Sequence, residues 1–278
     1  MSVAAVAEAA ADIEIGSAEH LALFRRALLD THNPYKPAIL DWPVLDDDAR
    51  RRRVELPIWD MAVRSEGHAN VRVLSYVDQV DDPLLRRAIE MNGFEEARHK
   101  RVLSNLAAAY AIPLAVEPDY PKPRDGEWAF LVTDYSECID SFFAFGLFTL
   151  AKRSRFFPSA LVEAFEPVMQ EEARHILFFR NWTAWHRARL PWWRKRIFDA
   201  RRGAVFARLI YQRVLIARGA GGNNFTAHGH QAKGINVKAR DVLDLCTADN
   251  DRRMSTHDAR LLRPNLVPRL AELCRRFV

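Results

Sequence analysis

The sequence predicts an all-α protein whose centre is a four-helix bundle made of two antiparallel hairpins. The first observation is a repeat, because Glu-Ala-Arg-His occurs at 96–99 and again at 172–175. The second is that apolar residues recur at helical spacing through 47–190, with no stretch of the alternation typical of strands. The third is the position of the turn signals, since a short turn separates the two helices of each hairpin and a long proline-rich connection joins the hairpins.

Composition places the chain among ordinary globular proteins. It has 278 residues, of which 49% are hydrophobic, and a formal net charge of +5. The basic excess is mild and spread out, so it permits an anionic partner without indicating nucleic acid. The three cysteines form no CxxC pair, which favours free thiols in a reducing cytoplasm. The N-terminus lacks the basic region of a signal peptide, and the longest apolar run, 142–151, is too short to cross a bilayer. We therefore expect a cytoplasmic protein without stable membrane insertion.

Residues 1–46 are predicted to form an N-terminal tail and a strap over the bundle. Ser17 is a candidate cap for a short helix over 17–30, whose apolar side includes Phe24 and Leu28. Prolines at 34, 37 and 43 then interrupt regular structure, so 31–46 is predicted to be irregular.

The bundle is predicted over 47–190. Its first hairpin joins a helix over 47–80, broken near Pro57, to a helix ending near 111, with Asp82 as cap and Pro83 at the first helical position. Four prolines between 113 and 123 make the crossover to the second hairpin. That hairpin joins helices over 125–152 and 159–189, and Pro167 is expected to kink the latter.

Residues 191–278 are predicted to form a fifth helix and a small helical cap. The fifth helix, over 192–218, is basic and amphipathic. A glycine-rich break at 219–222 precedes two or three short helices.

Each hairpin is predicted to bring a lone glutamate level with a Glu-x-x-His pair. Glu and His at i and i+3 project from one helix face, about 4.5 Å apart along the axis. In the first hairpin the midpoint between Glu66 and the pair Glu96/His99 falls at the 81–83 turn. In the second, the midpoint between Glu137 and the pair Glu172/His175 falls in the 153–158 turn. Four carboxylates and two imidazoles should therefore meet at mid-bundle.

Burial adds a reason to expect metal at this level. A glutamate on a core-facing stripe costs several kcal/mol unless its charge is compensated. No buried Lys or Arg is evident on these faces, so two divalent cations would supply the compensation. The competing interpretation is a set of surface Glu and His residues paired with Arg along each helix.

The six positions over about 52–190 resemble the ferritin-like di-iron carboxylate superfamily. This superfamily includes ferritins, rubrerythrins, the small subunit of class I ribonucleotide reductase and bacterial multicomponent monooxygenases. The resemblance implies that Glu66 and His99 serve one metal, that Glu137 and His175 serve the other, and that Glu96 and Glu172 bridge them. It also implies that Glu95 and Glu171 hold the outer nitrogen of the opposing hairpin's histidine, a role for which Asp140 is a rival. Oxygen and nitrogen ligands in this ratio suit two Fe ions, with Mn/Fe or Mn/Mn as alternatives.

Other candidates have an ordinary interpretation beside the functional one. His228 and His230 are either a metal pair or solvated loop residues, and His68 is a polar surface residue. His186 is either a core residue or the lining of a channel. Three tyrosines are either radical hosts or core residues: Tyr76, Tyr110 and Tyr135. The segment 192–196, Trp-Trp-Arg-Lys-Arg, is a dimer contact, a solvated face or a membrane-interface anchor.

The leading functional hypothesis is a dinuclear-metal oxidase or oxygenase that uses O2 as co-substrate and oxidises a small, partly apolar molecule. Several phenylalanines on the third and fourth bundle helices could enclose an apolar pocket: Phe142, Phe143, Phe145, Phe148, Phe165, Phe178 and Phe179. One alternative is a ferroxidase or iron-handling protein, and another is a non-catalytic binding protein that keeps the bundle. An external electron donor and a second copy of the chain are the expected partners, and nucleic acid is not.

Overall fold

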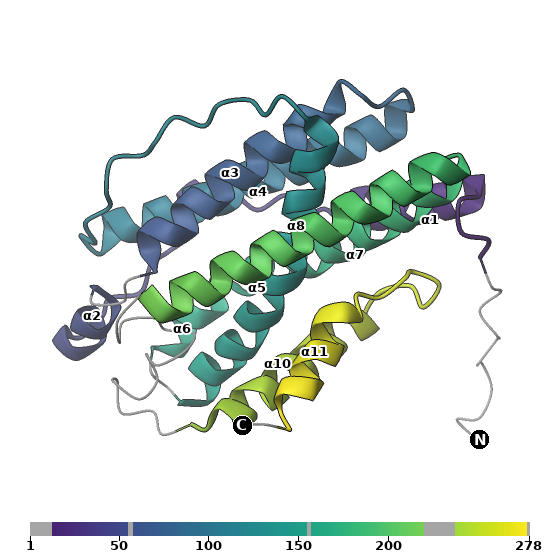
Figure 1. Ribbon diagram of the computed structural model, residues 1–278. Coiled ribbons are helices and arrows are strands. Elements are labelled where there is room, and N and C mark those ends of the chain that lie inside the picture. Colours follow the sequence, from purple (N-terminus) through teal and green to yellow (C-terminus); the bar gives the residue numbers. More distant parts are fainter. Residues whose placement is uncertain (1–12, 55–57, 155–156, 220–236, 277–278) are drawn as a thin grey trace, which may run out of the picture.

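The computed structural model describes residues 13–54, 58–154, 157–219 and 237–276. Every regular element within these ranges is helical, and no strand is present among them. Figure 1 shows the long helices lying side by side, with the crossover connection arching along the outer side of the α3–α4 hairpin before it enters α5. The predicted all-α class is confirmed.

Two hairpins supply the centre of the molecule. The first consists of α3 (Trp59–Val77) and α4 (Pro83–Ala109), and the second contains α5 (Gly126–Ser154) and α7 (Glu166–Arg189). The predicted start of α4 is confirmed, because Asp82 accepts a 2.7 Å hydrogen bond from the Leu85 amide and Pro83 opens the helix. Helix α3 packs against both α4 and α5, and α5 packs against α7. The two hairpins therefore share one core.

Two predicted helices are divided in the structure. The segment predicted over 47–80 forms α2 (Asp47–Val54) and α3, while residues 55–57 lie outside the described ranges. The segment predicted over 159–189 forms two helices, α6 (Ser159–Glu163) and α7, so the helix is interrupted where only a kink was expected. Because Pro167 has no N–H, it cannot continue the hydrogen-bond ladder of α6, but it is well accommodated in the first turn of α7.

The flanking segments cover the hairpins. Helix α1 (Ala18–Leu29) is capped by Ser17, whose hydroxyl accepts from the His20 amide at 3.0 Å, and it packs on α4 and α7. A short 3-10 turn, η1 (Pro37–Ile39), lies in the predicted strap. Helix α8 (Trp192–Gly219) packs on α5, as does α10 (Ala239–Ser255), and α11 (Leu266–Cys274) contacts α10. Residues 220–222 of the predicted break lie outside the described ranges.

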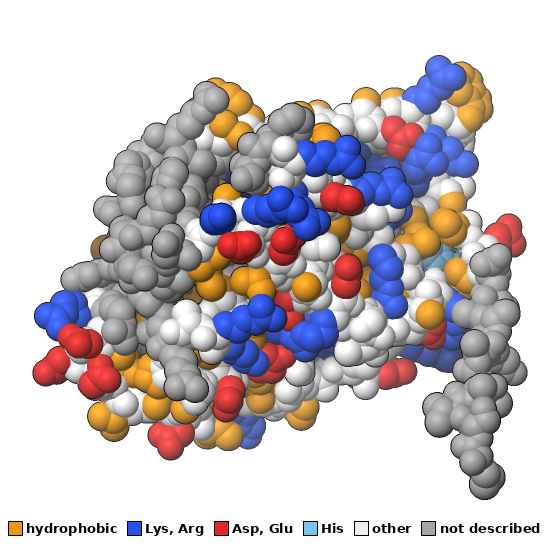
Figure 2. Space-filling model, turned by 90° about the horizontal axis from the view of Figure 1, so that it is seen from below, with side chains coloured by type: hydrophobic (Ala, Val, Ile, Leu, Met, Phe, Trp, Pro, Cys, Tyr) orange, Lys and Arg blue, Asp and Glu red, His pale blue; other side chains and the backbone are white. Residues whose placement is uncertain are grey.

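The main hydrophobic core is formed by side chains of both hairpins and of α1, α8, α10 and α11, and a smaller cluster lies around Leu106 and Leu161. Phe142, Phe145, Phe178 and Phe179 are fully buried in the main core, so these four side chains pack the core rather than line an open pocket. On the face seen in Figure 2, Lys and Arg side chains are spread over much of the surface, with Asp and Glu side chains between them. Among the described helices, none is both long enough and apolar enough to span a membrane.

Candidate metal centre

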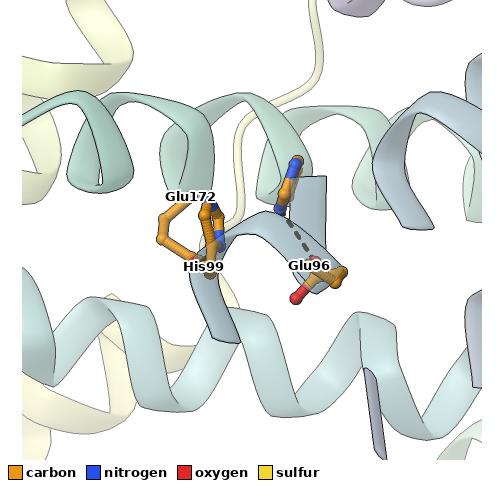
Figure 3. A group of neighbouring side chains, drawn as sticks. Glu96, His99 and Glu172 are labelled. Atoms are coloured by element: carbon orange, nitrogen blue, oxygen red, sulfur yellow. Dashed lines mark ion pairs between the residues drawn. The ribbon is translucent and has the colours of Figure 1, made fainter. Parts of the chain in front are cut away.

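The two copies of the repeated motif meet inside the protein. Glu96 and His99 come from α4, Glu172 and His175 come from α7, and all four side chains are buried. Each residue offers one ligand atom, and these atoms all lie within 4.8 Å of one another. Figure 3 shows Glu96, His99 and Glu172 converging in the space between helices. This group could hold a metal ion.

The histidines face the glutamates of the opposite motif. His99 Nδ1 lies 3.0 Å from Glu172 Oε1, and His175 Nδ1 lies 3.0 Å from Glu96 Oε1, the pair marked by the dashed line in Figure 3. Despite these short distances, neither Nδ1 atom and neither oxygen of Glu96 makes a hydrogen bond of good geometry within the described part of the chain. Buried polar atoms left without partners are costly. Because these particular atoms are good ligands for a divalent cation, the residues present fit a metal.

The outer nitrogen of each histidine is held by a carboxylate from the opposite motif. His99 Nε2 lies 2.8 Å from Glu171 Oε2, and His175 Nε2 lies 2.8 Å from Glu95 Oε2. A carboxylate on Nε2 keeps the proton there and leaves Nδ1 free to act as a ligand. Asp140, the rival for this role, instead pairs with Arg213 near the surface, at 3.1 Å from Oδ1 to Nε. That alternative is wrong.

Two buried arginines complete the repeat. Arg174 donates to Glu95 at 2.5 Å, and Arg98 donates to Glu171. Arg98 is 2% exposed and Arg174 is 5% exposed, so the expectation that no buried Arg lies on these faces is wrong. The two arginine charges equal in number the charges of Glu95 and Glu171, which we call the outer glutamates. The signal was present in the sequence, because the repeat extends to Glu-Glu-Ala-Arg-His at 95–99 and 171–175.

The N-terminal strap reaches the same network, which the sequence reasoning missed. His32 Nδ1 lies 2.5 Å from Glu95 Oε1, and the Tyr35 hydroxyl donates to Glu171 Oε2 at 3.4 Å. The Asn33 carbonyl accepts from Arg98 at 2.6 Å, and the guanidinium of Arg98 lies 4.2 Å from the centre of the Tyr35 ring. No periodicity marks these residues, since they lie in an irregular segment.

The two lone glutamates predicted as ligands lie at the edge of the buried group. Glu66 Oε2 is 3.7 Å from His99 Nδ1, and its side chain keeps 18% exposure. Glu137 is linked to Glu172 through the Ser141 hydroxyl, which lies 3.3 Å from Glu137 and 3.0 Å from Glu172. The structure therefore gathers four of the six predicted ligands tightly and places the other two beside them.

The pKa values of several buried Glu and His side chains are raised, because carboxylates are in excess in this group. Burial raises the pKa of Glu66 to about 8 and, together with the charges of Glu172 and Glu96, raises the pKa of Glu137 well above its usual range. Burial disfavours the His175 cation, but the adjacent Glu96 and Glu95 outweigh it and raise the pKa of His175 to about 9. In the absence of a metal, bound protons therefore supply positive charge that compensates these carboxylates.

A cavity of about 330 Å³ lies on the outer side of this network. It is bounded by the strap, by the first turns of α7 and by the end of α10, and Glu171 and Arg174 are part of its wall. Glu171, the carboxylate that holds His99, therefore lies in the cavity wall, although it is only 1% exposed.

The remaining candidates have structural contacts away from the buried group. His68 packs edge-on against Tyr120 at 4.9 Å between ring centres, and His186 stacks on Trp182 at 4.9 Å. The three tyrosines also serve packing and helix contacts. Tyr76 packs on Phe130, Tyr110 donates to the Pro43 carbonyl at 2.7 Å, and Tyr135 accepts from Arg202 at 3.0 Å. His228 and His230 lie outside the described residues.

Comparison with known proteins gave no match to a family model, to a curated protein or to a solved structure. Functional inference therefore depends on the geometry and charge of this centre.

Proposed function

We propose that the protein is a dinuclear-metal oxidase or oxygenase of the ferritin-like kind, with two iron ions as the first choice. The observation that carries this proposal is the separation of charges into two layers. Glu95 and Glu171 are each matched by a buried arginine. Among the described residues, no arginine forms an ion pair with the inner carboxylates of Glu66, Glu96, Glu137 and Glu172, and two divalent cations would balance them.

The ligands divide between two metal positions. Glu66 and His99 would hold one ion and Glu137 and His175 the other, with Glu96 and Glu172 between them. Carboxylate oxygen and imidazole nitrogen suit iron and manganese, so Mn/Fe and Mn/Mn remain the alternatives. The chemistry that a reduced pair supplies is the activation of O2 for oxidation of a small organic substrate.

The protein's own groups prepare the centre for that chemistry. Glu95 and Glu171 orient the two imidazoles, and Arg174 and Arg98 supply positive charges beside these two carboxylates. Buried aromatic side chains on α5 and α7 exclude water from the inner side. The antiparallel hairpins, the long crossover and the duplicated motif support a ferritin-like architecture.

Oxygen uptake by protein loaded anaerobically with Fe2+ tests the proposal. We expect rapid uptake by the native chain and loss of uptake in Glu96→Gln and Glu172→Gln, which remove an inner charge while keeping side-chain size. Glu117→Gln is the matched control, because Glu117 is an exposed partner of Lys100. Native protein that binds iron but takes up no more O2 than the two inner variants would contradict an oxidase. Uptake that continues with every addition of Fe2+ and deposits ferric mineral would support iron handling instead.

A further inference from the structure

Helix α8 carries an exposed face that is apolar along almost its whole length. Every residue of this face is exposed, and at 3.6 residues per turn they fall within about 140° of the helix circumference. Its large members include Trp192 at 72% exposure, Ile197 at 54% and Tyr211 at 63%. The α8 face consists of Trp192, Trp193, Arg196, Ile197, Ala200, Gly203, Ala204, Ala207, Ile210, Tyr211, Val214 and Leu215.

The residues of the α8 face are arranged symmetrically about the middle of the helix. Its residues pair off about a midpoint between positions 203 and 204, so that each pair of residue numbers has the same sum. From the ends inward, the pairs are Trp192 with Leu215, Trp193 with Val214, Arg196 with Tyr211, Ile197 with Ile210, Ala200 with Ala207 and Gly203 with Ala204. In an isologous interface, residue i contacts residue j and j contacts i. Two antiparallel copies of α8 crossing at this midpoint would satisfy that condition.

Side-chain size follows the same symmetry. Large residues occupy both ends of the face, and the four central positions are Ala or Gly. At Gly203 an added Cβ would meet no atom of the described residues within 4 Å, so no contact in that part of the chain requires a glycine there. Small residues at a crossing point let two helices approach closely, while large residues on either side bury apolar area.

Three arginines of α8 are directed away from this face, while Arg194 lies over the Trp193 ring, 5.2 Å from its centre. Arg201 pairs with Asp125 at 2.7 Å, Arg202 donates to the Tyr135 hydroxyl at 3.0 Å, and Arg213 pairs with Asp140. The one charged member of the face, Arg196, lies over the Trp192 ring of its own chain, 5.7 Å from its centre, and falls opposite Tyr211 of the other copy, where it can also contact the phenol ring. Figure 1 shows α8 at the front of the molecule, with no other labelled helix in front of it.

We propose that the α8 face is a dimer interface that takes a second copy of this chain in antiparallel orientation. The inference is independent of the metal chemistry. One helix per partner is at the small end of stable interfaces, so a dissociation constant in the micromolar range is expected.

Disulfide trapping tests the contact and its direction in the full chain. In a Cys274→Ser background, which removes the exposed cysteine, Ala204→Cys should give a covalent dimer on mild oxidation. Ile197→Cys and Ile210→Cys should each cross-link poorly alone and efficiently when mixed. Val116→Cys, at a 92% exposed site on the crossover, is the control for random collision.

Solution mass measured by light scattering provides the second readout. The native chain should be dimeric at tens of micromolar, and Ala204→Arg should shift it to monomer, with an unchanged helical circular dichroism spectrum. A native chain that stays monomeric, or cross-linking no greater than that of the Val116 control, would overturn the proposal. So would a monomer that binds anionic phospholipid vesicles through this face, because that outcome assigns the face to a membrane surface.

Discussion

Replacing Glu171 by Gln tests the outer charge layer, because it changes one atom of a buried ion pair. The Gln carbonyl can still accept from His99 Nε2, so the histidine keeps its partner. Arg98, which is 2% exposed, instead loses its nearest carboxylate and keeps the more distant Glu95, whose Oε1 lies 3.6 Å away. Removing one partner of a buried ion pair costs about 3–5 kcal/mol, whereas an exposed ion pair is worth about 0–1 kcal/mol.

The assay is urea unfolding of metal-free protein, followed by circular dichroism, for Glu171→Gln and for the control Glu117→Gln. The control breaks the exposed Lys100 pair and should cost less than about 1 kcal/mol. Adding Arg98→Met to Glu171→Gln removes the stranded charge and should restore most of the lost stability. A cost for Glu171→Gln no larger than that of the control would refute the assignment of Arg98 and Glu171 as a compensated buried pair.

Two further predictions concern metal binding. His175 and Glu66, with pKa values raised to about 9 and about 8, hold protons that a metal must displace, so affinity for Mn2+ should rise between about pH 6 and pH 9. Calorimetry in buffers of different ionisation enthalpy should show release of at least about two protons per chain at pH 7, and a pH-independent affinity would contradict this. His32→Ala removes the strap residue that contacts Glu95 and should weaken Co2+ binding about tenfold and shift the visible Co2+ spectrum. His68→Ala, which removes a ring packed on Tyr120, should leave both unchanged, and equal effects of the two variants would exclude a specific role for the strap.

Much of the fold could be predicted because its signals are local. Asp82 and Pro83 mark the start of α4, and Ser17 marks the start of α1, through capping that depends on a few neighbouring residues. The break between α6 and α7 was underestimated, because a proline alone does not show whether a helix bends or restarts. That outcome depends on packing against other elements.

The inner group could be predicted because equal distance from a turn places residues at equal depth in a hairpin. That reasoning led to Glu66 and Glu137, and both lie beside the tightly gathered four. The roles of Arg98 and Arg174 were missed because each acts on the opposite motif, and spacing within one helix does not show such a contact. The strap contacts depend on the path of an irregular segment, for which no periodic signal exists.

The measurement that bears most directly on the central claim is the number of metal ions bound per chain, with the distance between them. After anaerobic loading with Fe2+ and removal of excess metal, elemental analysis should give two ions per chain, and X-ray absorption should show an iron neighbour at roughly 3.5–4 Å. Glu96→Gln and Glu172→Gln should lower that number. One ion per chain without a metal neighbour would contradict a dinuclear centre, and trace metal only would contradict a metal site altogether.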